Sequence, residues 1–215
     1  MKNTKYNNHP FVEVKGDFTT WLGWPEISKK LADSISEVPA KAKIVVIETY
    51  QGVIHEEVEA QLKSGLKADL WINSKEAFKP EEEIAAMVYP DVTDDRIFGY
   101  LTRLNFTNYL HEQKITRLKN RIANQQGATV IYGPAASLIP EKYDLLIYAD
   151  MGRWEIQQRM RRHQVDNLGL SNRDTEDWML LYKQGFFVDW RVCDRLKKQL
   201  FDRWDFVLDT NVAGQ

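Results

Sequence analysis

The sequence predicts an α/β domain with three layers, in which a mostly parallel sheet carries helices on both of its faces. Strand-like runs such as residues 44–47 (IVVI) and 143–150 (YDLLIYAD) are apolar without regular alternation, as is typical of parallel strands covered on both faces. Helix-like segments separate these runs, so strands and helices alternate along the chain. The length of 215 residues and the hydrophobic content of 43% suit one sizeable core.

The elements follow from local patterns. Pro25 stands in the first turn of a helix, and apolar side chains repeat on one face of that helix. Gly65 and Gly127 each end a helical pattern. The expected strands are 44–47, 68–73, 128–134, 143–150 and 206–208, with a short one at 11–14; the expected helices are 26–35, 55–63, one opening at 79–83, 107–125, one from 153, 175–184 and 190–201. We expect residues 1–40 to form an arm and a helix packed on a domain of residues 41–215.

The composition excludes several classes of protein. The net charge of −2 and the pI of about 6.1 do not favour nucleic acid as a partner. No apolar run approaches the ~20 residues that cross a bilayer, and the first ten residues lack the apolar segment of a signal peptide. A single cysteine, Cys193, fits a reducing compartment. We therefore expect a cytoplasmic protein that binds neither nucleic acid nor membrane.

The turn after the strand 44–47 is the first candidate site. A strand, a turn and a helix open many nucleotide-binding folds, which hold phosphate at the helix N-terminus. This turn contains Gly52, and His55 starts the helix, but the Gly-Lys-Ser/Thr of a phosphate loop is missing. Glu48 is expected to put a negative charge at the mouth of the turn. Weak phosphate binding by Gly52 and His55 and a tight connection without a ligand both remain open.

The basic helix after Asp150 is the second candidate. Arg159 and Arg162 are three residues apart and so face the same side, and Arg161 lies beside them. Arginine suits bidentate contacts with phosphate, and Arg153 stands at the start of the helix. A solvated basic face without a ligand is the alternative to a phosphate site.

Carboxylates form the third candidate. Asp91, Asp94 and Asp95 cluster in the sequence, and Asp69 and Asp150 belong to the same acidic set. Carboxylates at strand ends can hold Mg²⁺ or act as a general base. A solvated acidic loop is the alternative. The four histidines are scattered, without the spacing of a zinc or iron site, so no resident metal site is predicted.

The second half of the chain resembles P-loop kinases of the uridine kinase and phosphoribulokinase type. The similar segments are the strand 143–150 ending on Asp150, the run 159–163 (RMRRH), and residues 172–178 (NRDTEDW). The resemblance implies a P-loop kinase-like sheet, with Arg159, Arg161 and Arg162 closing over phosphates. Tyr132 stands where that family has a glutamate, and the missing Gly-Lys-Ser/Thr removes the groups that neutralise charge in phosphoryl transfer.

A second resemblance is to the kinase-like module that precedes the cupin domain in some bacterial class I mannose-6-phosphate isomerases. It rests on residues 149–157 (ADMGRWEIQ), 185–191 (GFFVDWR) and 201–211 (FDRWDFVLDTN). The resemblance implies a phosphosugar enzyme as partner. The metal ligands of a cupin are not visible in this sequence, so the chain itself is not expected to isomerise sugars.

Three hypotheses follow. In the first, the domain binds a phosphorylated sugar or a nucleotide, with Arg159, Arg161 and Arg162 on the phosphates, as an accessory to a mannose-6-phosphate isomerase-type enzyme. In the second, it is a kinase for a small hydroxylated substrate. That kinase would use Mg²⁺, a nucleotide and an unconventional phosphate loop, with Asp150 or one of Asp91, Asp94 and Asp95 as base or Mg²⁺ ligand. Asp91, Asp94, Asp95 and Arg153 are the residues expected toward the substrate. In the third, it is a structural domain without a ligand. The sequence does not name the cofactor or the oligomeric state.

Overall fold

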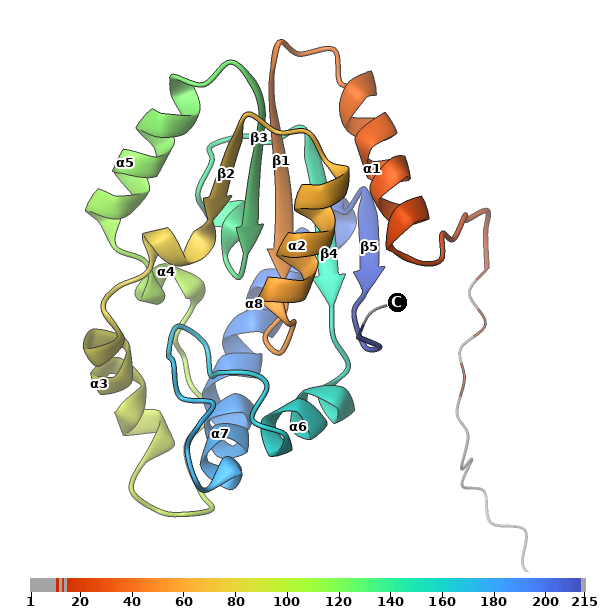
Figure 1. The fold of residues 1–215 in the computed structure, drawn as a ribbon. Helices are drawn as coiled ribbons and strands as arrows, with labels where there is room; N and C mark the ends of the chain where they lie inside the picture. The colour runs from red at the N-terminus through yellow and green to blue at the C-terminus, as the bar shows by residue number, and fades with distance from the viewer. Residues whose placement is uncertain (1–10, 12, 14, 214–215) are drawn as a thin grey trace, which may run out of the picture.

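The computed structural model describes residues 11, 13 and 15–213, which form a five-stranded parallel sheet between helices (Figure 1). The strand order is β2-β3-β1-β4-β5, and every neighbouring pair is parallel. The strands are β1 (Ala42–Thr49), β2 (Leu70–Asn73), β3 (Gly127–Gly133), β4 (Leu145–Asp150) and β5 (Phe206–Asp209). Of the strand predicted at 11–14, residues 12 and 14 lie outside the described residues.

Helices cover both faces of the sheet. In Figure 1, α2 lies in front of the strands and α8 passes behind them. The helices are α1 (Trp24–Glu37), α2 (His55–Gly65), α3 (Glu81–Val92), α4 (Phe106–Tyr109), α5 (Glu112–Ala123), α6 (Arg153–Arg161), α7 (Trp178–Gln184) and α8 (Trp190–Leu200). The predicted three-layer α/β fold with a parallel sheet is thereby confirmed. Among the described residues, no helix has the length and apolarity that spanning a membrane requires.

The apolar runs of the sequence form the centre of the sheet. Val45, Val46 and Ile47 are fully buried in β1, which pairs with β3 on one side and β4 on the other. Burying such side chains contributes about 1.5–3 kcal/mol each, and only a strand covered on both faces buries consecutive ones. The arm before α1 contacts β5 at the edge of the sheet. There the rings of Trp21 and Phe206 form a T-shaped contact, with 6.2 Å between the ring centroids.

The helix predicted over residues 107–125 is interrupted. It consists of α4 and α5, and the chain between them pairs with the segment after β2 instead of continuing the helix. Leu110 forms an antiparallel bridge with Phe78, and the His111 amide donates to the Ala77 carbonyl at 2.8 Å. These tertiary hydrogen bonds engage backbone groups that a helix would use, so the local helical pattern is overridden.

The two helices predicted at 175–184 and 190–201 are joined without a break. Residues Gly185–Asp189 form a π-helical turn, which lets α7 run directly into α8. Asp189 is buried in this turn and accepts hydrogen bonds from the Asn167 side chain (2.7 Å) and the Leu168 amide (3.2 Å). These contacts tie the loop after α6 to the helices beneath the strand ends.

Candidate functional site

The carboxyl edge of the sheet is where a ligand site is expected, because all five strands end there. The chain leaves β1 toward β2 on one side and leaves β4 toward β5 on the other, so the order switches between β1 and β4. Open α/β sheets bind ligands in the crevice at such a point. The turn after β1 and the start of α6 after β4 therefore flank the position to inspect.

The turn between β1 and α2 is packed shut against α6. Gly52 adopts a φ of +96°, a conformation that favours glycine, and a Cβ there would lie 2.7 Å from the Ile156 side chain. Gln51 is buried, and its side chain accepts from the Trp190 indole at 2.9 Å and donates to the Asp166 carbonyl at 3.0 Å. The Gln51 side chain thus connects the turn to α8 and to the loop after α6.

Arg159 of α6 donates a hydrogen bond to the backbone of this turn. Its side chain is only 2% exposed, and its guanidinium donates to the carbonyls of Gly52 (2.9 Å), Thr210 (2.7 Å) and Asn211 (3.3 Å). Its Nε also faces Glu155 at 3.3 Å. These contacts occupy the donors that a phosphate would need, and burial lowers the pKa of the group. Arg159 therefore connects β1, α6 and the chain after β5.

The other predicted arginines lie on the outside of α6. Arg161 stacks its guanidinium over the Trp178 ring at 4.6 Å. Arg162 is half exposed and donates to Glu155 (2.6 Å) and to the Gln164 side chain (3.0 Å). Arg159 and Arg162 do share a side of the helix, since both contact Glu155, but neither Arg161 nor Arg162 reaches the turn after β1.

The prediction that Glu48 puts a charge at the mouth of the turn is wrong. Its side chain is 1% exposed and points into the protein, where its two carboxylate oxygens accept from the amides of Ala135 (2.6 Å) and Ser137 (2.8 Å). Ala135 has a left-handed backbone (φ +62°), which turns both amides toward the carboxylate. Burial raises the pKa of Glu48 to about 7, against the opposing effect of these hydrogen bonds.

A small cavity opens beside the turn. It has a volume of about 40 Å³ and lies between the start of α2, the segment after β2 and the loop after α6. Gly52, His55, Lys75, Asp166 and Arg173 are among its lining residues. Ile54, the N-cap residue of α2, makes no side-chain capping hydrogen bond, and His55 and Glu56 of the first turn line the cavity. The ammonium of Lys75 has no ion-pair partner among the described residues, so the cavity carries a cation that is free to meet an anion.

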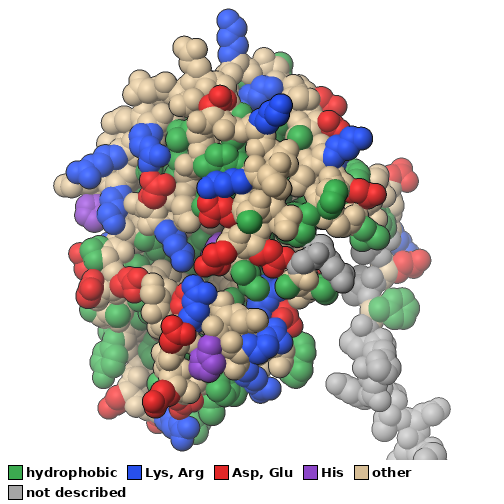
Figure 2. All heavy atoms as spheres, viewed as in Figure 1, with side chains coloured by type: hydrophobic (Ala, Val, Ile, Leu, Met, Phe, Trp, Pro, Cys, Tyr) green, Lys and Arg blue, Asp and Glu red, His purple; other side chains and the backbone are tan. Residues whose placement is uncertain are grey.

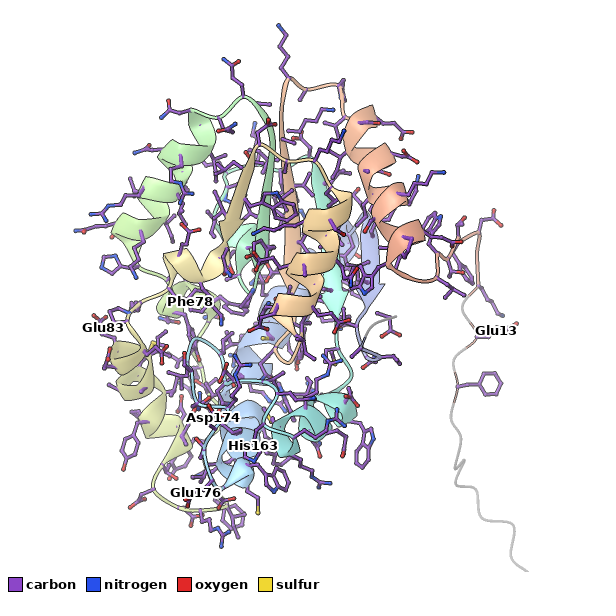
Figure 3. The ribbon with its side chains drawn as sticks, in the orientation of Figure 1. Glu13, Phe78, Glu83, His163, Asp174 and Glu176 are labelled. Carbon is purple, nitrogen blue, oxygen red and sulfur yellow. The ribbon has the colours of Figure 1, made fainter. Side chains whose placement is uncertain are left out.

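Arg173 is oriented by its neighbours. It forms ion pairs with Asp166 (3.1 Å) and Glu56 (3.5 Å), and its amide donates to Asp166 at 2.6 Å. The Nδ1 of His163 lies 2.7 Å from the Arg173 carbonyl, so this nitrogen donates. Figure 3 places His163 and Asp174 close together on this loop, in front of α7. Over the face shown in Figure 2, basic and acidic side chains are interspersed.

His55 lies at the cavity but is not a cation there at neutral pH. Burial lowers its pKa to about 4, and the nearby Lys75 acts in the same direction. We expect the His55 imidazole to stay neutral between pH 5.5 and 8, as followed by its ring nitrogen shifts in NMR. Titration near pH 6.5, the ordinary value for histidine, would contradict this environment. A bound phosphate would raise the pKa of His55 toward that value.

Asp150 and Arg153 lie in a network of charges at the end of β4. Asp150 pairs with Lys197 at 2.6 Å, and Arg153 pairs with Asp194, which also accepts from the Tyr50 hydroxyl at 2.8 Å. The Lys197 ammonium stands 5.6–5.8 Å from the ring centroids of three aromatic residues, Tyr50, Tyr148 and Trp204. One carboxylate oxygen of Asp150 is buried without a partner among the described residues. These two predicted site residues thus belong to one network around Tyr50, and neither lines the cavity.

The acidic cluster at the end of α3 is remote from the cavity. Asp91 accepts from the Thr102 hydroxyl at 2.5 Å, and Asp95 accepts from the amides of Ile97 and Phe98, both at 2.7 Å. Asp94 is exposed in the same loop. The residues lining the cavity do not include any of the three aspartates. Among the described residues, no three His, Cys, Asp or Glu side chains stand together as a metal site would require.

Lys75 and Arg173 are not among the site residues that the sequence predicts. Lys75 lies two residues after β2, in the strand end 73–78, which is one of the places where a parallel sheet is expected to bind ligands. Arg173 reaches the cavity only because the long loop after α6 folds back over α2, and no local pattern reports such a return.

The fold and the site define a parallel α/β domain whose first turn is closed by its own side chains. The chain belongs to the family described as "Domain of unknown function (DUF8485)", whose profile matches residues 23–215. No curated protein matches the sequence. Among solved structures, the chain is similar to one described as a possible uridine kinase from Bacillus stearothermophilus. The identity is 10%, the match covers 86% of this chain and 98% of that one, and the TM-score is 0.45.

Proposed function

We propose that this domain binds a phosphorylated small molecule, a sugar phosphate or a nucleotide, through its phosphate group and without transferring it. The observation that carries the proposal is Lys75, an exposed residue that lines a cavity at the carboxyl edge of the sheet and forms no ion pair among the described residues. The start of α2, where Ile54 provides no side-chain cap, adds the positive end of the helix dipole. This ligand contact replaces the arginine contacts on α6 that the sequence suggested.

The size of the cavity favours a phosphate group over a whole nucleotide. A volume of about 40 Å³ holds roughly three water-sized atoms, at 10–15 Å³ for each. That space suits the oxygens of a phosphate, with the rest of the ligand outside. Asp166 and Glu56 both pair with Arg173, so Lys75 is the cation left for the ligand.

The absence of transfer chemistry rests on the closed turn. A P-loop kinase neutralises its phosphates with a loop lysine and holds Mg²⁺ with the following hydroxyl, and both are missing from residues 48–55. Gly52 and Arg159 engage each other instead. Asp150, the candidate base, pairs with Lys197, which disfavours the kinase hypothesis relative to a binding role.

The resemblance to the module of mannose-6-phosphate isomerases supports a sugar phosphate as the ligand and an isomerase-type enzyme as the partner, in the cytoplasm. A cupin-type isomerase domain is the partner that this proposal names. The ligand would then be the substrate or product of the partner enzyme, held by the accessory domain.

Binding is tested by thermal shift and calorimetry with mannose 6-phosphate, fructose 6-phosphate, UTP and ATP with Mg²⁺, and with unphosphorylated mannose as the control ligand. A ligand at a hundredfold excess over its Kd raises the stability by about 2.7 kcal/mol. We expect at least one phosphorylated compound to bind, and mannose to leave the melting temperature unchanged.

Lys75→Ala should weaken that binding about tenfold or more, since a charge-assisted contact is worth about 1.5–3 kcal/mol. Lys67→Ala is the matched control, because it removes an exposed lysine before β2, at the opposite edge of the sheet. No shift with any phosphorylated ligand at millimolar concentration, or equal affinity in Lys75→Ala, would refute the proposal.

A further inference from the structure

A second, larger cavity lies at the edge of the sheet that β5 forms. It measures about 760 Å³ and is enclosed by the arm before α1, by α1 itself and by β5. Apolar side chains form much of its wall: Trp21, Leu22, Ile27, Leu31, Phe206 and Val207. The volume falls in the range of 300–1,000 Å³ that ligand sites occupy. It is separate from the Lys75 cavity, because the two share no lining residue.

The wall formed by β5 is a sheet edge without backbone pairing. β5 is last in the strand order and, among the described residues, pairs only with β4, so half of its backbone groups point away from the sheet. The four residues of β5 (FVLD) include neither lysine nor proline, which commonly prevent pairing at an edge strand. Val207 is 54% exposed on this strand. Within the described chain, no backbone hydrogen bond joins the arm to β5.

The charged residues at the two ends of β5 are acidic, and each has one carboxylate oxygen in a hydrogen bond. Asp205 and Asp209 bracket the strand, and both are exposed. Asp205 accepts from the Leu146 amide (2.7 Å) and Asp209 from the Asn211 amide (2.9 Å), each through one oxygen. Neither forms an ion pair among the described residues. Lys30, the cation on the cavity wall, stands over the Trp21 ring at 5.7 Å.

We propose that β5 and this cavity form a docking site for an extended segment of a partner protein, which adds a sixth strand to the sheet. Backbone hydrogen bonds to the free edge of β5 would supply affinity, as in other cases of strand addition. Alternate side chains of an added strand point to one face, so every second residue would be apolar and would enter the cavity. Lysine or arginine at the ends of the segment would meet Asp205 and Asp209.

A peptide library displayed on phage and selected on the full chain tests this proposal. The enriched peptides are expected to alternate apolar and polar residues over about five positions, with Lys or Arg at the ends. Proline in the centre of a selected peptide should abolish binding, because it removes a ladder hydrogen bond. Enrichment of no sequence, or of peptides without alternation, would overturn the docking site.

Variants locate the binding. Val207→Lys places a charge on the free edge and should weaken a selected peptide about tenfold or more. Asp209→Lys should change the preference from basic to acidic at the end of the segment that meets residue 209, while the end at Asp205 stays basic. Leu101→Lys is the matched control, since Leu101 is exposed to a similar degree (59%) in the loop after α3. Urea unfolding of each variant confirms that it is folded, and unchanged affinity in a folded Val207→Lys would contradict the proposal.

Discussion

Replacing Arg159 with alanine is expected to destabilise the protein by about 3 kcal/mol or more, measured by urea unfolding. The change removes a buried guanidinium and leaves the carbonyls of Gly52 and Thr210 without their donor. Each buried polar group that loses its partner costs about 1–3 kcal/mol, and the lost side-chain volume adds a cavity. Arg159→Lys should recover only part of the stability, because an ammonium cannot reproduce the planar fork of donors.

Arg162→Ala is the control for this prediction. Arg162 lies one turn further along the same side of the helix, but it is half exposed, and its ion pair with Glu155 is open to solvent. Exposed ion pairs contribute about 0–1 kcal/mol, so the control should lose little stability. If Arg159→Ala stayed within 1 kcal/mol of the wild type and lost phosphate affinity instead, the original interpretation of the basic helix would be right.

Glu48→Gln is expected to change how stability depends on pH. The pKa of Glu48 is about 7 in the folded protein, against 4.5 as its ordinary value. The folded state therefore holds this proton more tightly than the unfolded state, and the contribution is largest below pH 4.5. It is lost as the pH rises to 7, by an amount on the order of 3 kcal/mol. The variant should lack this decline, so its stability relative to the wild type should improve between pH 4.5 and 7.

The measurement is a series of urea unfolding curves from pH 4 to 8 for both proteins. Their difference isolates Glu48, because His55 is present in both proteins and contributes equally to both curves. In each curve His55 acts oppositely to Glu48: its pKa is lowered to about 4, so its contribution grows as the pH rises toward 6.5. Glu83→Gln, at an exposed position on α3, tests whether any lost carboxylate has the same effect. A constant difference between the Glu48→Gln and wild-type curves would contradict the buried, protonated state of Glu48.

Much of the fold could be predicted because its elements are locally encoded. The apolar run at 44–47 and the glycine at 65 mark β1 and the end of α2 without reference to the rest of the chain. The break between α4 and α5 could not be predicted, because it depends on Phe78 and Ala77, which lie more than thirty residues away in the sequence.

The candidate site was harder for the same reason. The sequence shows that Glu48 follows an apolar strand, but whether its carboxylate meets solvent depends on the loop after β3, where Ala135 and Ser137 supply the amides. Arg159 has the composition of a phosphate ligand, and only the fold reveals three carbonyls around it. Side-chain type limits the chemistry, whereas the tertiary partner decides whether that chemistry is available.

The closure of the first turn has a consequence for protein engineering. A designer who grafted a Gly-rich loop with Lys and Ser onto residues 48–55 would change the acceptor of Arg159 at Gly52 and the contact with Ile156 at once. The unaltered α6 would then hold the buried Arg159 guanidinium beside the grafted loop. A lysine in that loop would be repelled by this like charge. Nucleotide binding would therefore require joint redesign of the turn, of α6 and of the segment after β5, which the hydrogen bonds of Arg159 connect.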